Sequence, residues 1–350
     1  MICTDLSIAL APILARYDKD QVVVVYDENI SLPTGVAGLT TKWSNSLYGL
    51  TVSETSKSLE TVSLIWDFLF KQGITRRGLL IAVGGGVLTD LCGFAAATYK
   101  RGIDYINIPT TLLAMVDAST GGKTGINYHG LKNSIGLFAP PVATLIWPSW
   151  LKTLPPQQFL SGFAEMLKTG LIADQRPTTN DQRLFDRLLQ YDLDTMDSDA
   201  ITPLIADCIA VKEQIVTADP HEEGIRKTLN FGHTFGHALE ELSHAQGSPL
   251  DHGFAVLYGL IAELYLSVVK LSCPKEPLQQ LTQVMLHDYG KPQCKCSDRD
   301  KLIAFMQHDK KNEHATDINC TLLRAVGEPL INQLITPQDA AEALDYLFSL

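Results

Sequence analysis

The chain has 350 residues, of which 45% are hydrophobic and 19% charged, and its formal net charge is -11 with a pI of about 5.2. These values are typical of a globular protein with a large core and two domains, and they argue against a nucleic-acid partner, which usually meets a basic face. The seven cysteines follow no disulfide-framework or zinc-site spacing, so we expect reduced thiols in a cytoplasmic protein.

The N-terminal stretch MICTDLSIALAPILARYDKD has two acidic residues close behind a short apolar run, which predicts a helix rather than a targeting peptide. No apolar run approaches the length of about 20 residues that a membrane span needs. Up to about residue 150, short apolar runs at 22–26, 79–83, 105–108 and 142–147 predict buried strands, and residues 54–71 have helical spacing. Runs of this kind that alternate with helices favour a parallel sheet with crossover helices.

Beyond Pro155-Pro156, long helical patterns dominate, at roughly 157–172, 198–217, 228–243, 252–270 and 338–348. A single late apolar run, 320–326, is a candidate isolated strand. We therefore predict an NAD-binding α/β domain with a Rossmann-like parallel sheet over residues 1–153. A mainly α-helical domain that binds metal and substrate is expected over residues 154–350.

A glycine-rich turn follows the run at 79–83, where the sequence reads LLIAVGGGVLTD. A strand, the glycines 84–86 and a helix start would bring backbone N–H groups and a positive helix end to a pyrophosphate. The tract is not a GxGxxG fingerprint, so a purely structural turn is an equal alternative. Thr110, Thr111 and Asp117 follow the next strand and add polar groups where a cofactor would lie.

The tract 121–127 (GGKTGIN) has glycines beside a lysine, as a phosphate cradle does. The glycine that a Walker A loop has five residues earlier is absent, so a kinase-like function is disfavoured. Lys123 remains a candidate for binding a substrate anion. Lys310 is a second candidate, although a lysine pair in a polar stretch also fits solvated surface.

The tract 230–237 (NFGHTFGH) places His233 and His237 four residues apart on a predicted helix, so both imidazoles leave the same face. His252 follows soon after. The pattern predicts a divalent-metal site and by spacing alone favours His237 as a ligand, while an ordinary structural histidine pair is the alternative.

Taken together, five tracts resemble the 3-dehydroquinate synthase family of sugar-phosphate cyclases: GGGVLTDLCGFAAATYKRGI, IPTTLLAMVDASTGGKTGIN, SGFAEMLKTGLI, RKTLNFGHTFGHALE and DHGFAV. The resemblance runs from about Tyr26 to Lys311. It implies conversion of 3-deoxy-arabino-heptulosonate 7-phosphate to 3-dehydroquinate and phosphate in the shikimate pathway. The implied route is transient NAD-mediated oxidation, phosphate elimination, reduction and intramolecular aldol closure. A homodimer with bound NAD⁺ and one divalent metal, Zn²⁺ or Co²⁺, is also implied.

The resemblance further implies roles for individual residues. The metal ligands would be Glu165, His233 and His252, which makes His237 a substrate and proton-transfer residue instead of a ligand. The catalytic residues would be His237, Glu222 (as a general base), Lys168 and Asp117. The NAD⁺ site would comprise Asp27, Glu54, Lys57, Gly84, Gly85, Gly86, Asp90, Thr110, Thr111, Lys132 and Thr153. The substrate would contact Asp117, Lys123, Asn133, Lys212, Arg226, Asn230, His237, Lys310 and an Arg101 that reaches in from the dimer partner.

Two other functions remain open from the sequence. One is a sister cyclase that acts on a sugar phosphate without a carboxylate, such as a 2-deoxy-scyllo-inosose or 2-epi-5-epi-valiolone synthase. The other is a metal- and NAD-dependent polyol dehydrogenase, which would have no use for the phosphate-facing Lys123, Asn133 and Lys310. Phe254 departs from the family pattern, because many members have Glu at this position. The segment 242–252 looks longer than usual, which leaves its path to the metal open.

Overall fold

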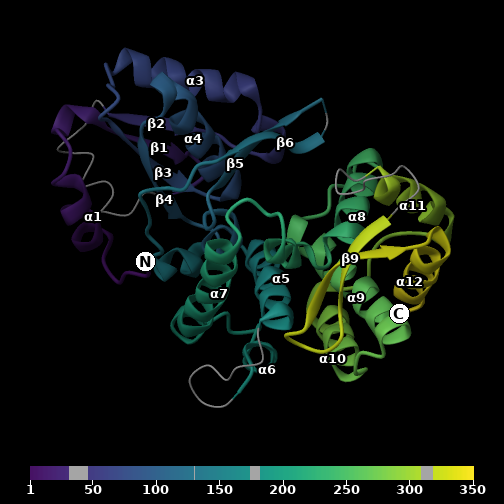
Figure 1. Cartoon of the computed structure of the whole chain (residues 1–350). Coiled ribbons are helices and arrows are strands. Elements are labelled where there is room, and N and C mark those ends of the chain that lie inside the picture. The colour runs from purple at the N-terminus through teal and green to yellow at the C-terminus, as the bar shows by residue number, and fades with distance from the viewer. Residues whose placement is uncertain (31–45, 130, 174–181, 309–317) are drawn as a thin grey trace. The chain divides into compact units, whose positions relative to one another are not determined.

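The computed structural model describes residues 1–30, 46–129, 131–173, 182–308 and 318–350 (Figure 1). The chain divides into two compact units, Met1–Pro155 (unit 1) and Pro156–Leu350 (unit 2). Of the predicted site residues, Lys310 lies outside the described residues.

Unit 1 is built on a five-stranded parallel sheet in the order β2-β1-β3-β4-β7. Its strands are β1 (Val22–Asp27), β2 (Leu47–Leu50), β3 (Leu79–Gly84), β4 (Asp104–Pro109) and β7 (Ala143–Thr144). The prediction of a parallel α/β sheet is confirmed. The order corresponds to the doubly wound arrangement 2-1-3-4-5, in which ligands bind beyond the carboxyl ends of the strands at the switch point between the first and third. Here those ends are Asp27 and Gly84.

The described α-helices of unit 1 are α1 (Leu6–Leu14), α3 (Leu59–Lys71) and α4 (Gly86–Thr98). One core cluster joins apolar residues of α3 and α4 to alternate residues of β1 and β3. Both helices therefore cover the same face of the sheet (Figure 1). The predicted helix over 54–71 begins only at Leu59, because Ser58 caps it and residues 54–56 form a separate 3₁₀ turn.

An antiparallel hairpin of β5 (Lys123–Tyr128) and β6 (Leu131–Phe138) occupies the tract that resembled a phosphate cradle. Ile126 of β5 is buried in the same core cluster, and β5 packs against α4. Nearly all of β6 is exposed. The hairpin was not predicted, because an exposed strand shows no alternation of apolar and polar residues.

Unit 2 is mainly helical, as predicted. Its helices are α5 (Pro156–Ile172), α6 (Leu184–Leu189), α7 (Ser198–Ala218), α8 (His233–Ala245), α9 (His252–Leu271), α10 (Glu276–Val284), α11 (Arg299–Gln307) and α12 (Pro337–Ser349). The predicted late strand exists as β8 (Ile318–Leu323), but it is not isolated, because it pairs with β9 (Pro329–Ile335) in an antiparallel hairpin.

Helix α9 is the central element of unit 2 and packs against α5, α8, α12 and β8 (Figure 1). Among the described helices it alone is long and apolar enough to cross a membrane, but 67% of its most apolar window is buried inside the protein. That burial is typical of a core helix. The first residues of α8 and α9 are His233 and His252, so the fold places two predicted metal ligands at helix starts.

Candidate metal centre and active site

Glu165, His233 and His252 bring one ligand atom each to within 4.8 Å of one another, from α5, α8 and α9. The Nε2 atoms of His233 and His252 lie 3.6 and 3.3 Å from Glu165 Oε1. Glu165 is completely buried. The structure therefore collects the three residues that the family resemblance gave as metal ligands.

The spacing of these atoms fits a single divalent cation. Two ligands at about 2.1 Å from a tetrahedral Zn²⁺ stand roughly 3.4 Å apart, close to both distances. Nδ1 of His233 is 3.1 Å from the carbonyl oxygen of Phe231, and only a protonated Nδ1 can donate to a carbonyl. Nδ1 of His252 faces Glu240 Oε2 at 3.5 Å. Both rings thus present Nε2 to Glu165.

His237 belongs to the same group of imidazoles but is not among the three converging ligand residues. Its ring centroid lies 5.2 Å from that of His233 and 6.2 Å from that of His252. His237 therefore lies beside the cluster rather than in it.

Gly253 lets α9 approach α5 closely enough to bring His252 to Glu165. Its backbone N–H donates to Ser161 Oγ at 3.0 Å. A Cβ at this position would stand 1.9 Å from the carbonyl oxygen of Ser161. Only glycine fits this crossing, directly beside the ligand.

Charge is concentrated around the cluster. Lys168, one turn after Glu165 on α5, forms an ion pair with its carboxylate. Burial lowers the pKa of His252, but the hydrogen bonds and negative charges of Glu165 and Glu240 outweigh it and raise the pKa to about 10. The site therefore attracts positive charge, whether a proton or a metal ion.

Among the described residues of unit 2, three cations have buried side chains: Lys168, Lys212 and Arg226. They come from α5, α7 and the 3₁₀ turn Ile225–Asn230, which pack against one another. Arg226 is 2% exposed and donates from Nη1 to the carbonyl of Pro220 at 2.7 Å. Three buried cations on neighbouring elements concentrate positive charge, so this region is suited to a negatively charged ligand.

Asp219 organises the loop that leads to Arg226. Its carboxylate accepts hydrogen bonds from the backbone N–H groups of Glu223, Gly224 and Arg226 at 3.0, 2.7 and 3.0 Å. Burial raises the pKa of Asp219, but these hydrogen bonds and the charge of Arg226 more than offset it and lower the pKa. No sequence pattern indicates this residue, because its partners are backbone groups.

Three predicted site residues have left-handed backbone conformations that non-glycine residues rarely adopt: Arg101, Asn133 and Glu222, with φ of 70°, 50° and 61°. Glu222 accepts a hydrogen bond at Oε1 from Nδ2 of Asn230, at 3.1 Å. Arg101 is exposed and follows Lys100, which is also left-handed. Strain of this kind persists where the surrounding structure enforces it, and it is common at functional sites.

In unit 1 the glycine turn joins the end of β3 to the start of α4. Gly85 is the N-cap of α4 and offers no side-chain oxygen to the first N–H groups of the helix. Thr110 donates its backbone N–H to Gly84 at 3.0 Å, and its buried hydroxyl has no partner within the described part of the chain. A helix start without a side-chain cap at the switch point, with a buried hydroxyl next to it, fits a dinucleotide phosphate.

Several predicted cofactor and substrate residues are linked by hydrogen bonds beside this turn. Lys57 is 5% exposed, pairs with Asp90 at 2.5 Å and donates to Asn133. Asn127 donates to Glu54 Oε1 at 2.8 Å and accepts from the backbone N–H of Asn133 at 2.9 Å. The hairpin β5–β6 is thereby attached to the segment 54–57.

The remaining predicted residues of unit 1 are less enclosed. Asp27 and Thr111 are half-buried, and Asp117 lies in a π-helical turn, Ala114–Ala118, a feature often found at functional sites. Lys132 is half-buried on β6. Lys123 and Thr153 are exposed, and the Thr153 hydroxyl bonds to the carbonyl of Trp150.

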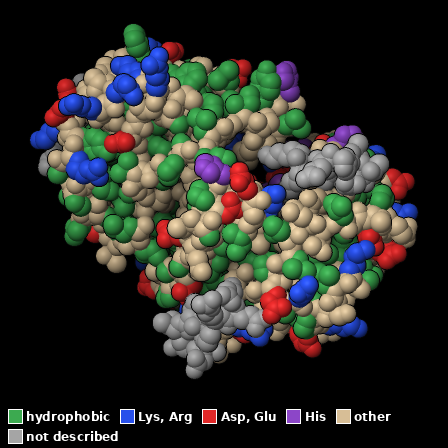
Figure 2. All heavy atoms as spheres, in the orientation of Figure 1, with side chains coloured by type: hydrophobic (Ala, Val, Ile, Leu, Met, Phe, Trp, Pro, Cys, Tyr) green, Lys and Arg blue, Asp and Glu red, His purple; other side chains and the backbone are tan. Residues whose placement is uncertain are grey.

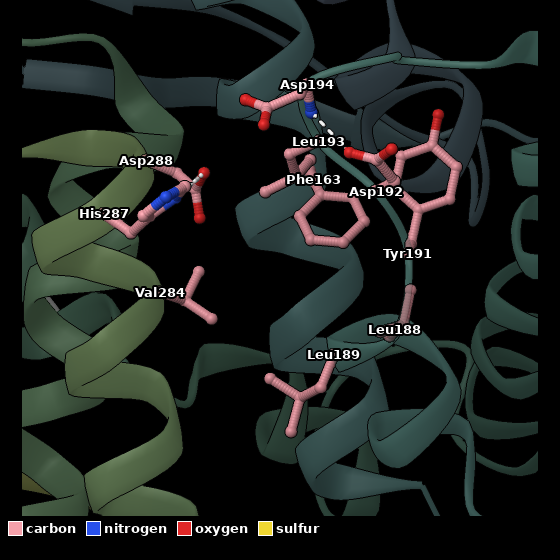
Figure 3. Close-up of a pocket in the computed structure, with 10 residues that line it drawn as sticks. All are labelled: Phe163, Leu188, Leu189, Tyr191, Asp192, Leu193, Asp194, Val284, His287 and Asp288. Carbon is pink, nitrogen blue, oxygen red and sulfur yellow. Dashed lines mark hydrogen bonds and ion pairs between the residues drawn. The ribbon is translucent and has the colours of Figure 1, made fainter.

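A separate cavity of about 190 Å³ lies in unit 2 (Figure 3). None of the predicted site residues line it. Phe163, on α5, points into it, but Phe163 precedes Glu165 by two residues, and side chains two apart leave a helix in nearly opposite directions. His287 and Asp288 face the segment 191–194 across the opening (Figure 3). The cavity is therefore distinct from the metal cluster.

Glu240 was not predicted as a site residue, although the sequence contains a signal for it. It stands seven residues after His233 and three after His237, so all three share one face of α8. It is 4% exposed and faces Nδ1 of His252. A carboxylate behind a metal-binding histidine orients the ring and makes it a stronger ligand.

Comparison with known proteins identifies the family. Residues 48–161 match the family profile described as 3-dehydroquinate synthase N-terminal, and residues 162–312 match that described as 3-dehydroquinate synthase C-terminal. A 3-dehydroquinate synthase of Parabacteroides distasonis is 41% identical over 349 residues, which cover 99% of this chain and 96% of that protein.

Solved structures agree on the fold. The 2-epi-5-epi-valiolone synthase ValA of Streptomyces hygroscopicus subsp. jinggangensis, solved with NAD⁺ and Zn²⁺ bound, superposes with a TM-score of 0.82 at 27% identity, covering 100% of this chain and 96% of ValA. A 2-deoxy-scyllo-inosose synthase, complexed with carbaglucose-6-phosphate, NAD⁺ and Co²⁺, gives a TM-score of 0.78 at 23% identity, with 96% and 94% covered. The chain therefore belongs to the 3-dehydroquinate synthase family of phosphate-eliminating lyases in the shikimate pathway.

Proposed function

We propose that this enzyme converts 3-deoxy-arabino-heptulosonate 7-phosphate to 3-dehydroquinate and phosphate, with NAD⁺ bound by residues 1–153 and a divalent metal by residues 154–350. The observation that carries the proposal is the convergence of Glu165, His233 and His252 in a unit that also buries Lys168, Lys212 and Arg226. A metal site beside buried cations suits a substrate that has vicinal hydroxyls and two anionic groups.

Glu165, His233 and His252 would hold Zn²⁺ or Co²⁺, and the donor set leaves positions open for substrate oxygens. When bound, the cation supplies a Lewis acid and NAD⁺ supplies a reversible hydride acceptor. His237, next to the cluster, is suited to move a proton on substrate oxygen. Glu222 is proposed as the general base, positioned by Asn230.

The anionic ends of the substrate require fixed cations. Arg226 offers a planar fork of donors that matches a carboxylate, and its position is set by Asp219 and Pro220. We assign Arg226 and Lys212 to the carboxylate and Lys168 to catalysis beside the metal. From the remainder of the predicted set, Asp117, Lys123, Asn133, Asn230 and Lys310 would complete the substrate contacts.

NAD⁺ would lie on the glycine turn. The uncapped start of α4 and the buried hydroxyl of Thr110 support this position for its phosphates. Lys57 and Asp90, already paired, would define one wall of the site. The other proposed contacts are Asp27, Glu54, Gly84, Gly85, Gly86, Thr111, Lys132 and Thr153.

The test compares the amount of phosphate released with the amount of NADH that accumulates. Purified enzyme with sub-stoichiometric NAD⁺ and excess substrate should release phosphate over many turnovers with no lasting rise in NADH absorbance. Accumulation of one NADH for each substrate consumed would show a dehydrogenase instead. Phosphate release of similar efficiency from sedoheptulose 7-phosphate, which lacks the carboxylate, would reassign the chain to a sister cyclase.

We also propose a cytoplasmic homodimer. Among the described strands β6 pairs only with β5, so it is an edge strand of a two-stranded sheet. Exposed apolar side chains line this hairpin: Tyr128, Leu131, Ile135, Leu137 and Phe138. Hydrophobic side chains also reach the surface of unit 1 on the face in Figure 2. An exposed apolar edge strand is a pairing site, and a second copy of the chain is the occupant we propose.

A further inference from the structure

Glu263 is a buried carboxylate to which the family resemblance gives no role. It lies in the middle of α9 and is 0% exposed. Its Oε2 accepts a hydrogen bond from the backbone N–H of Gly232 at 2.7 Å, and its Oε1 accepts one from the backbone N–H of Thr234 at 3.2 Å. The two donors are the residues on either side of the proposed ligand His233.

These contacts replace a missing helix cap. Gly232 is the N-cap of α8, has φ of 80° and has no side chain to satisfy the first N–H groups of the helix. Glu263 supplies the acceptor from the neighbouring helix, and its negative charge complements the positive end of α8. Charged hydrogen bonds to buried donors are among the stronger and more directional ones.

The geometry points to Glu263 as a positioning residue for the metal centre, an inference that rests on the proposed metal site. By holding the backbone at Gly232 and Thr234, it fixes the carbonyl of Phe231 and the Cα of His233. The carbonyl of Phe231 in turn accepts the Nδ1 proton of His233, which leaves Nε2 directed at Glu165. Glu263 therefore determines where the ligand nitrogen stands without touching the metal.

Other contacts make this arrangement stiff. Ser267 donates to the carbonyl of Glu263 at 2.7 Å and accepts from the backbone N–H of Leu323 at 2.9 Å, which joins α9 to β8. Thr234 donates its hydroxyl to the carbonyl of Asn319, also on β8, at 2.8 Å. The N-terminus of α8 is thus tied to α9 and β8 together.

The test compares Glu263→Gln with Leu264→Ala in the full chain. Glu263→Gln keeps the shape but turns one acceptor into a donor that faces an N–H group. Leu264→Ala removes a fully buried side chain from the same helix and serves as the structural control. Affinity for Co²⁺ is measured by competition with a chelator, together with the visible absorption spectrum of bound Co²⁺ and the melting temperature.

Glu263→Gln should weaken Co²⁺ binding about 10- to 100-fold and alter the Co²⁺ spectrum, the range expected when the support of a ligand is lost. Leu264→Ala should lower the melting temperature and leave both metal readouts unchanged. If Glu263→Gln does not fold, Glu263→Asp, whose side chain is one methylene shorter and so weakens both hydrogen bonds, should show the same loss.

Unchanged Co²⁺ affinity and spectrum in the Glu263 variant would overturn the inference, and so would an equal loss in Leu264→Ala. His233→Ala separates this failure from that of the proposed function. If the parent protein binds Co²⁺ no better than His233→Ala does, the metal centre itself is wrong. If His233→Ala loses Co²⁺ affinity but Glu263→Gln binds Co²⁺ as tightly as the parent, the metal centre is supported and the positioning role of Glu263 is refuted.

Discussion

Gly253→Ala tests whether the crossing of α5 and α9 sets the metal geometry. The added Cβ would lie 1.9 Å from Ser161 O and 2.5 Å from Ser161 C and Cα, and all three are backbone atoms that cannot turn away. The first distance is about 1.5 Å short of ordinary van der Waals contact. One helix must therefore move relative to the other.

The movement acts on the ligand next to the substitution. His252 Nε2 is now 3.3 Å from Glu165 Oε1. A shift of about 1.5 Å along that line would open the gap to roughly 4.8 Å, more than two metal–ligand bonds of about 2.1 Å can span. Overpacking of this kind also costs about 1–3 kcal/mol in the free energy of unfolding. Misplacement by 1 Å can lower a rate about 100-fold.

We therefore expect Gly253→Ala to weaken Zn²⁺ or Co²⁺ binding and to lower kcat/KM, each by at least about 100-fold. The control is Phe254→Ala, at the next position. It removes a ring that packs edge-on against Tyr289 at 4.9 Å and should lower the melting temperature without changing metal affinity. A Gly253→Ala protein that binds metal as tightly as the parent would refute the proposed dependence of the site on this crossing.

Three further predictions concern the metal, the substrate and pH. Exhaustive chelation should lower activity at least about 100-fold, and Zn²⁺ or Co²⁺ should restore it; full activity in protein shown to be metal-free by elemental analysis would contradict the ligand assignment. Arg226→Ala should reduce the preference for the carboxylate-bearing substrate over sedoheptulose 7-phosphate by a factor of about 30 to several thousand. The preference is measured as the ratio of the two kcat/KM values, and Arg226→Lys should keep part of this preference. Burial raises the pKa of Asp339, but hydrogen bonds from Lys270 and Thr336 outweigh it and lower the pKa below its ordinary value of 3.8. The ionised carboxylate therefore stabilises the folded protein fully above pH 3.8, and this stabilisation is lost as the pH falls through the lower pKa of the folded state. Melting curves of the parent and Asp339→Asn should therefore converge in acid, and a constant difference at all pH values would contradict this.

The parallel sheet could be predicted from sequence because its central strands are buried on both faces. β3 is buried at all six positions and β1 at its first four, which gives the continuous apolar runs that periodicity detects. β2 was not predicted, since a half-buried strand of four residues at the edge of the sheet leaves little pattern. β9 was missed for a related reason: most of its residues are half-buried or exposed, and its pairing with β8 is defined by tertiary contact.

The residues of the candidate site also differ in how far the sequence predicts them. The spacing of His233 and His237 indicated a metal-binding face on a helix, but spacing cannot tell which histidine meets ligands from other helices. Glu165 carries no local signal, because an acidic residue in a helix is usually solvated. Family resemblance supplied it, and its complete burial beside two imidazoles is a property of the packed helices. Glu263 lies beyond both kinds of inference, since its partners are backbone N–H groups.

Arg101 allows the proposed dimer to be tested through activity. It is exposed and strained at the end of the turn that follows α4, as expected of a side chain that serves the partner subunit. Arg101→Ala and His233→Ala should each inactivate their homodimers. If Arg101 acts across the interface, a mixed dimer has one site with both lesions and one intact site. Random exchange makes about half of the dimers mixed, so an equal mixture should regain roughly a quarter of the parent activity. The fraction of mixed dimers is measured with two affinity tags. Mixed dimers that form in the expected amount but stay inactive would place Arg101 in the active site of its own subunit.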